Sequence, residues 1–372
     1  MIIHVVQPGE TITSIANFYH LTEERLILEN GIVNPNNLAV GQTIVIVYPL
    51  ISHTVMEGDT LGSIAELYQV SLMQILRNNP YLSDRQYIYP GETITISYET
   101  EKIGTMSVGG YVYSYVDRNI LRKTLPFLTF VTVFDYRILS NGELNELDDQ
   151  DIVNMAKEYG VVPMMLVSTL SERGIGNRQV ADVILSNPEI QDRLIDNIVA
   201  TIHAKGYLGL NQYIQFIDPN NIEKIEALIR KISVRLKSEG LRYTITITPR
   251  VDVERTEVIY ENIDFSNLSQ YVDAILFLSY DWAYSFGPPA PKSPINIVKE
   301  TINQVIKAVP TNKIVLGVTV IGYDWELPYV PGYTVANAIT FNTAIQLAAD
   351  NDVPIQFNKM ASSPYFFYYS VD

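Results

Sequence analysis

The chain beyond residue 103 alternates between two patterns of hydrophobic and polar positions. Short, nearly continuous apolar runs predict buried strands, and segments with apolar residues at every third or fourth position predict helices. We expect strands at 106–115, 128–134, 161–168, 210–217, 243–248, 274–280 and 314–321, and helices at 149–159, 177–204, 221–239 and 294–308. Because strands that alternate with helices form parallel sheets, seven such strands favour an α/β fold of the (β/α)8 barrel type over an open sheet.

The first hundred residues contain an internal repeat. Residues 4–19 align without a gap on residues 53–68, an offset of 49 positions. The match continues at Asn30 and Asn79 and, after one insertion, at Gly41 and Gly91. Each unit has the pattern of a strand, a turn, two short helices and a closing strand, at 43–47 or 93–97. The repeat therefore predicts two small βααβ domains, residues 1–49 and 50–98.

Turn and cap residues recur at matching positions of the two units. Gly9 and Gly58 allow the turn after the first strand, and Thr11 and Thr60 can cap the helix that follows. Since both units keep the same start signals, we expect the same backbone path in each.

Composition narrows the range of partners. With 26 Lys and Arg against 41 Asp and Glu, the net charge is −15, which disfavours nucleic acid and anionic membranes. No apolar run approaches the roughly 18–20 residues that span a bilayer. The chain has no Cys and four scattered His, so we expect no thiol chemistry, no metal site and no cofactor.

The two N-terminal units resemble LysM domains, small folds that bind polymers containing N-acetylglucosamine (GlcNAc), such as peptidoglycan and chitin. The glycine, acid, threonine, Ser-Ile-Ala and asparagine recur in the same order over residues 3–97. In that family the glycan lies between the loop before the first helix and the loop after the second. The resemblance implies glycan contacts at Gly9, Glu10, Thr11, Ile12, Asn30 and Ile32, and at Gly58, Asp59, Thr60, Leu61, Asn79 and Tyr81. For any single residue, the alternative is that it only forms a turn or a cap.

Residues 103–372 resemble a family 18 glycoside hydrolase domain of the type found in bacterial spores. The resemblance rests on segment 206–217 as the fourth barrel strand, on Leu-Ser-Tyr-Asp-Trp at 278–282, on segment 322–329 and on segment 362–366. It implies a (β/α)8 barrel behind the two LysM domains. The family continues past the last residues of this chain with an eighth strand, so the sequence predicts a barrel that lacks its last strand. A partner, a rearrangement or further chain would have to close it.

The fourth strand departs from the family motif D-x-x-[DN]-x-D-x-E. The matching positions hold Leu208, Asn211, Tyr213 and Gln215. The resemblance assigns the catalytic acid to the position of Gln215, and to the position of Tyr213 the carboxylate that orients the substrate's N-acetyl oxygen. Because alternate residues of a strand share a face, we expect these two side chains and Asn211 to face the barrel interior, and Gln212 to face the helices.

Loss of the acid predicts loss of hydrolysis, because a glutamine amide donates no proton at ordinary pH and general acid catalysis contributes about 10²–10⁴ in rate. A sugar-binding face is expected to remain. Its predicted lining is Tyr111, Phe134, Asn211, Tyr213, Gln215, Tyr280, Asp281, Trp282 and Trp325. For each aromatic residue the alternative is packing in the core.

Three functions are consistent with these features. The first is a non-catalytic protein that binds peptidoglycan or another GlcNAc polymer in the spore cortex, spore coat or cell wall. The second is an active N-acetylglucosaminidase whose acid is displaced to Asp281, Asp218 or Asp135. The third is a structural spore-coat component with no sugar in the barrel. The N-terminus lacks the pattern of a Sec signal peptide, and the sequence leaves the oligomeric state open.

Overall fold

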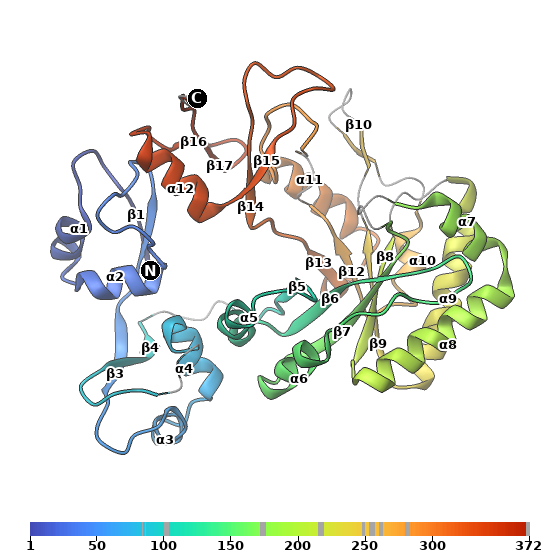
Figure 1. The fold of residues 1–372 in the computed structure, drawn as a ribbon, viewed down its shortest axis with the longest axis horizontal. Coiled ribbons are helices and arrows are strands. Elements are labelled where there is room, and N and C mark those ends of the chain that lie inside the picture. Colours follow the sequence, from blue (N-terminus) through green and yellow to red (C-terminus); the bar gives the residue numbers. More distant parts are fainter. Residues whose placement is uncertain are drawn as a thin grey trace.

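The computed structural model describes residues 1–372 except 84, 86, 100–103, 172–175, 215–218, 248–249, 253–256, 260–262, 280–282, 284 and 370–372. The side chains of 219, 250–252 and 257–259 also lie outside the description. Three hydrophobic cores form, one in each N-terminal repeat and one in the large α/β domain. Figure 1 shows the two repeats, in blue, beside that domain.

Each N-terminal repeat has the predicted βααβ fold. The first consists of β1 (Ile2–Val5), α1 (Ile12–Tyr19), α2 (Glu23–Asn30) and β2 (Thr43–Ile46). The second consists of β3 (Pro49–Thr54), α3 (Leu61–Leu67), α4 (Leu72–Asn78), a 3-10 turn η1 (Pro80–Leu82) and β4 (Thr93–Tyr98). In both, the first and last strands pair antiparallel. The expected caps are present, since the hydroxyls of Thr11 and Thr60 accept from backbone N–H groups three residues on, at 3.1 and 3.0 Å.

The large domain is built on a seven-stranded parallel sheet in the order β13-β12-β9-β8-β7-β6-β5. The strands are β5 (Gly109–Tyr113), β6 (Phe130–Arg137), β7 (Val162–Ser168), β8 (Gly209–Ile214), β9 (Arg242–Ile247), β12 (Ala274–Phe277) and β13 (Ile314–Leu316). Each overlaps a predicted strand, so the parallel α/β architecture is confirmed. In the described part of the chain, β5 and β13 are the two edges.

The sheet is strongly rolled. The Tyr111 hydroxyl on β5 lies 2.8 Å from Thr246 Oγ1 on β9, four strands away in the sheet order. In a flat sheet these strands would be roughly 19 Å apart, because neighbours are separated by about 4.8 Å. The hydrogen bond therefore requires the sheet to curve into most of a barrel, with the middle of β5 facing β9 across the interior.

Helices cover the outside of this rolled sheet (Figure 1). They are α5 (Arg118–Thr124), α6 (Gln150–Glu158), α7 (Arg178–Ser186), α8 (Pro188–Lys205), α9 (Ile222–Ser238), α10 (Phe265–Leu268) and α11 (Ile295–Val305), with 3-10 turns η2 (Leu125–Phe127), η3 (Pro219–Asn221) and η4 (Thr311–Lys313). A short hairpin, β10 (Arg250–Asp252) and β11 (Glu257–Ile259), follows β9. None of the described helices has the length and apolar character needed to cross a membrane.

Two predicted elements differ from the structure. The single helix expected at 177–204 is two helices, because Asn187 leaves the helical conformation and its side chain caps α8, with Pro188 as the first residue of α8. The strand expected at 314–321 ends at Leu316. Ile321 instead begins β14, which belongs to a different sheet.

A separate unit, the α12 subdomain (residues 321–365), follows the seventh strand. It contains β14 (Ile321–Asp324), β15 (Asn337–Thr340), α12 (Phe341–Asp350), β16 (Gln356–Asn358) and β17 (Ser363–Tyr365), paired as two hairpins. The backbone N–H of Ile355 donates to Val40 O in the first repeat at 2.8 Å. The second repeat contacts the large domain, where Arg77 Nη1 donates to Pro126 O at 3.2 Å. Both repeats are thus docked on the rest of the chain.

Candidate glycan-binding site

A polar network centred on Asn211 occupies the concave face of the sheet. Asn211 is 4% exposed, and its Oδ1 accepts from the Tyr111 hydroxyl at 3.3 Å and from Thr246 Oγ1 at 2.9 Å. Its Nδ2 donates to Thr244 Oγ1 at 2.8 Å. The two threonines were not among the predicted site residues. The sequence signal for them was the alternation of threonine in segment 243–247. Alternate residues of a strand point to the same face of the sheet, here the face on which Asn211 lies.

This network holds hydroxyls and amides and includes no carboxylate. Loss of hydration at its hydroxyl raises the pKa of Tyr111 to about 12, against the smaller lowering effect of the hydrogen bond with Thr246. Although Tyr111 is 41% exposed as a residue, its hydroxyl is the part held in the network. At neutral pH the described network can donate and accept hydrogen bonds, but it supplies no general acid of suitable pKa.

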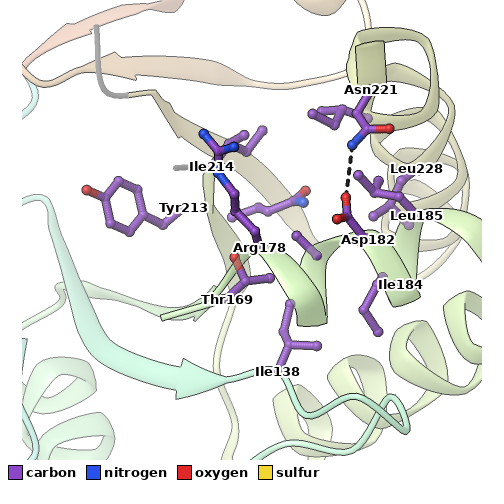
Figure 2. A pocket seen from close by; sticks show the side chains of 13 residues that line it. Ile138, Thr169, Arg178, Asp182, Ile184, Leu185, Tyr213, Ile214, Asn221 and Leu228 are labelled. Carbon is purple, nitrogen blue, oxygen red and sulfur yellow. Dashed lines mark hydrogen bonds between the residues drawn. The ribbon is translucent and has the colours of Figure 1, made fainter. Parts of the chain in front are cut away.

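The two faces of β8 carry different side chains, as predicted. Figure 2 shows the ring of Tyr213 pointing away from Leu185 and Leu228, which line a pocket of about 120 Å³ between β8 and helices α7 and α9. Gln212 lines that pocket on the helix side, where it accepts a hydrogen bond from the buried Tyr243 hydroxyl. This partner explains why an amide is tolerated on the helix-facing side of the strand.

Several predicted site residues fall outside the described part of the chain: Gln215, Tyr280, Asp281 and Trp282, together with the alternative acid Asp218. Their positions stay predictions. Leu208, the first position of the degenerate motif, lies one residue before β8 and is 47% exposed.

A group of three aromatic side chains, two of them exposed, lies at the carboxyl end of β5. Tyr113 and Tyr115 stack at 5.1 Å between ring centroids with an interplanar angle of 14°, and Phe134 meets Tyr113 edge-on at 5.2 Å. Tyr113 is 51% and Tyr115 is 80% exposed. Only Phe134 of this group was predicted, although the alternation of Tyr at 111, 113 and 115 pointed to one face. Flat, exposed rings with polar tips suit sugar surfaces.

Asp135 lies beside this aromatic group at a β-bulge of β6, where the register shifts between Val133 and Tyr136. Its Oδ1 is buried without a hydrogen-bond partner among the described residues. Burial raises the pKa of Asp135 to about 6, and the hydrogen bond with Ser168 and the charge of Arg137 oppose this shift only in part. A carboxyl group that stays protonated to about pH 6 is the kind of group that serves as a general acid.

Trp325 follows β14 and belongs to the α12 subdomain. Its indole Nε1 donates to Gly287 O at 2.9 Å, and its ring meets Tyr323 edge-on at 5.5 Å. No contact described for it involves the Asn211 network. The predicted association of Trp325 with the concave face therefore stays a prediction.

In the LysM-like repeats, the two asparagines have their polar atoms occupied. Asn30 Nδ2 donates to Leu26 O and Val45 O, and its Oδ1 accepts from Val45 N. Asn79 makes the equivalent bonds to Ile75 O, Thr95 O and Thr95 N. Each side chain joins the end of the second helix to the closing strand. These bonds shape the loop that follows, where Ile32 and Tyr81 lie.

A hydrogen-bonded chain of acid, histidine and tyrosine holds the other loop in the same way in both repeats. In the first, Glu10 Oε2 lies 2.9 Å from His4 Nε2 and accepts from Gln7 N at 2.7 Å. In the second, Asp59 Oδ2 lies 2.8 Å from His53 Nε2 and accepts from the backbone of residue 56 at 2.7 Å. In each repeat the other ring nitrogen lies 3.2 Å from a tyrosine hydroxyl.

These bonds lower the pKa of both carboxyls. For Glu10 the backbone N–H of Gln7 is the largest cause, and for Asp59 it is the hydrogen bond with His53. The hydrogen bonds of the acid and the histidine thus fix one side of the loop before the first helix in each repeat. These loops contain Thr11 and Ile12 in the first repeat and Thr60 and Leu61 in the second. The aligned His and Tyr in the two repeats were the sequence signal for this arrangement.

No group of three or more acidic or histidine side chains suited to a metal ion occurs in the part of the chain that the structure describes.

Comparison with known proteins places this architecture. The model of glycosyl hydrolases family 18 matches residues 177–369, and the LysM domain model matches 4–47 and 53–97. The chain belongs to glycosyl hydrolases family 18, with two LysM domains ahead of the family domain. It is similar to the cortical fragment-lytic enzyme of Bacillus subtilis (strain 168), with 29% identity over 373 residues that cover 99% of this chain and 86% of that protein.

Solved structures agree with this assignment. The crystal structure of the spore cortex-lytic enzyme SleL of Bacillus megaterium QM B1551 has a TM-score of 0.79 and 28% identity, over 99% of this chain and 86% of that one. A class V chitinase of Nicotiana tobaccum shares the fold, with a TM-score of 0.56 and 17% identity over 70% of this chain and 84% of that one.

Proposed function

We propose that the chain binds cortex peptidoglycan, or another GlcNAc polymer, through its LysM domains and the concave face of its barrel-like domain, without hydrolysing it. The observation that carries this proposal is Tyr213, whose ring lies on the side of β8 away from the helix-side pocket, at the position where the family motif places the orienting carboxylate. Gln215 at the position of the acid supports the same conclusion. The names of the cortex-lytic relatives support cortex as the glycan.

Tandem LysM domains suit a polymer, because the second contact is made at high effective concentration once the first has formed. The formal charge of −15 favours the uncharged sugar face over anionic groups as the point of recognition. Because the relatives are named for the spore cortex, the spore cortex or coat is the proposed location.

The test is co-sedimentation of the purified chain with isolated cortex peptidoglycan, with mass spectrometry of the supernatant. The expected result is saturable binding without released muropeptides. Binding accompanied by released fragments whose amount increases with time would reject the non-catalytic hypothesis. No binding at all would reject the glycan-binding function.

We predict that the aromatic group contributes to this binding. Replacing Tyr113 and Tyr115 together by Ala should weaken binding roughly 2- to 12-fold, because stacked aromatic contacts contribute about 0.5–1.5 kcal/mol. Co-sedimentation over a range of protein concentrations measures the change. The matched control is Tyr333→Ala, which removes a tyrosine that is 85% exposed in the α12 subdomain. Equal affinities for all variants would exclude the aromatic group from the site.

A second candidate function, hydrolysis with Asp135 as acid, is favoured by the unpartnered carboxyl oxygen at the β6 bulge. In this reaction Asp135 donates its proton to the glycosidic oxygen and the bond from that oxygen to the anomeric carbon breaks. Water then adds to the anomeric carbon and returns a proton to the Asp135 carboxylate. One water is consumed, and two sugar ends are formed.

Asp135→Asn tests this candidate through two measurements. If Asp135 is the acid, hydrolysis by the unaltered chain falls about tenfold per pH unit above pH 6 and is absent in the variant. Independently, the variant should be more stable at pH 8. In the unaltered chain the pKa of Asp135 is higher in the folded state than in the unfolded state. The stability contributed by the neutral carboxyl is therefore fully present below about pH 4 and is lost as the pH rises through 6. The total loss in the free energy of unfolding is up to roughly 3 kcal/mol.

The exposed Asp148→Asn is the control for both measurements. A stabilised variant with unchanged hydrolysis would place the acid elsewhere, whereas a silent chain with a stabilised variant agrees with the non-catalytic proposal.

A further inference from the structure

The first LysM domain and the α12 subdomain form a groove that neither unit has alone. One wall is the loop from the end of α2 to the start of β2, with Asn34 and Asn37, and the other is α12, with Asn342 and Gln346. Figure 1 shows α12, in red, next to the blue first repeat. Both units are needed to enclose the space between them.

The docking of the two walls is specific. Asp350 Oδ1 accepts from Asn37 Nδ2 at 3.2 Å and from Gln346 Nε2 at 2.5 Å, so one carboxylate joins both walls. A methyl group added at Gly41, where φ is +86°, would lie 2.2 Å from Ile355 O. At Gly91, the matching position of the second repeat, nothing lies within 4 Å. Close approach of the α12 subdomain therefore distinguishes the first repeat from the second.

The second LysM domain has a different neighbour at the corresponding loop. There the turn η1 packs against α2 of the first repeat and α5 of the large domain. The two LysM domains thus share a fold but present their second loops to different surroundings, so their binding sites differ.

The groove has the chemistry of a site for a neutral, N-acetylated sugar. Its walls combine amides with aliphatic side chains: Asn34, Asn342, Gln346, Ile32, Val33 and Ile345. None of the described residues that line it carries a charged side chain. The side-chain amides of Asn34 and Asn342 have no hydrogen-bond partner among the described residues. They are therefore available to a ligand, one from each wall.

The groove measures about 70 Å³. Since a water molecule needs about 10–15 Å³ of such space, it holds several waters or one group the size of an acetamide. The aliphatic side chains suit the acetamido methyl, and the amides suit its N–H and C=O groups. The sugar ring and the rest of the chain would lie outside, along the two walls.

We propose that this groove is a composite binding site for the acetamido group of a GlcNAc-type sugar, formed jointly by the first LysM domain and helix α12. The proposal rests on the proposed function. It goes further in two respects. It assigns a glycan contact to the family domain outside its barrel face, and it makes glycan binding by the first LysM domain depend on the docking of the α12 subdomain.

The experiment uses the full chain and a soluble GlcNAc tetramer that carries a photoreactive diazirine, with cross-linked peptides mapped by mass spectrometry. Cross-links are expected in both 30–37 and 342–346. One variant per wall, Asn34→Ala and Asn342→Ala, should each lower the affinity for the tetramer about 2- to 10-fold, because each removes a hydrogen bond to the sugar. The yield of these cross-links over a range of tetramer concentrations measures the change.

The matched control is Asn337→Ala, an exposed asparagine of the same subdomain outside the groove. Unchanged melting temperatures show that the variants fold. If Asn34→Ala weakens cross-linking and Asn342→Ala does not, or if Asn342→Ala strengthens it, the composite site is wrong while LysM binding stands. If no peptide of either LysM domain cross-links, the composite site is wrong and so is glycan binding by the LysM domains; if no peptide of the chain cross-links at all, the proposed function has failed.

Discussion

The double variant Gln215→Glu with Tyr213→Asp should release muropeptides from cortex peptidoglycan, whereas we expect no release by the unaltered chain. The reason is local chemistry. A glutamic acid at the family position supplies the proton that the glycosidic oxygen needs, a contribution of about 10²–10⁴ in rate. An aspartate two residues earlier replaces a bulky neutral ring by the carboxylate that orients the substrate's N-acetyl oxygen. Mass spectrometry of the soluble fragments over time measures the gain.

The single variants are the controls. Tyr213→Asp alone restores the orienting group without an acid, so it should stay silent. Gln215→Glu alone keeps the tyrosine in the space that the acetamido group needs, so it should gain little. A double variant that binds glycan but remains silent would mean that the face has changed beyond these two positions. Cleavage by the unaltered chain would contradict the prediction and direct attention to Asp135.

The repeats could be predicted from sequence in detail because their determinants are local. Thr11 and Thr60 cap helices through bonds that span three residues, and the offset of 49 positions supplied a second copy of every signal. The strand positions were also recognisable, since nearly continuous apolar runs mark strands buried on both faces. The periodicity on both sides of Pro188 predicts one continuous helix and hides the break, although proline is a common first residue of a helix.

The site was predicted less completely because its contacts are long-range. Asn211 was expected to face the interior, but its partners come from β5 and β9, and only the curvature of the sheet joins them. The raised pKa of Asp135 depends on burial at a bulge that no short pattern marks. The docking of α12 on the first repeat brings Asn37 and Asp350 together across most of the chain. Such contacts follow from the assembled fold.

One buried carboxylate illustrates how the fold supports the site from the outside of the sheet. Asp149 is fully buried, at 0% exposure. Its Oδ2 accepts from the Tyr136 hydroxyl at 2.6 Å and from the Tyr207 hydroxyl, and its Oδ1 lies 2.5 Å from Lys205 Nζ. Burial, reinforced by the hydrogen bond with Asp149, raises the pKa of both tyrosines. The cluster thereby joins β6, α8 and the start of β8.

Asp149→Ala should therefore cost about 3–5 kcal/mol, because it leaves two buried hydroxyls and a lysine without their shared partner. Thermal unfolding followed by circular dichroism should show a decrease in melting temperature on the order of 10 °C. Asp149→Asn, which keeps an acceptor but loses the ion pair, should fall between. The control is Asp148→Ala, which alters the exposed neighbour. Equal melting of the Asp149→Ala and Asp148→Ala variants would mean that the cluster carries no net stability. Because Tyr136 adjoins Asp135, and Tyr207 lies four residues before Asn211, a loosened cluster should also weaken glycan binding below the melting transition.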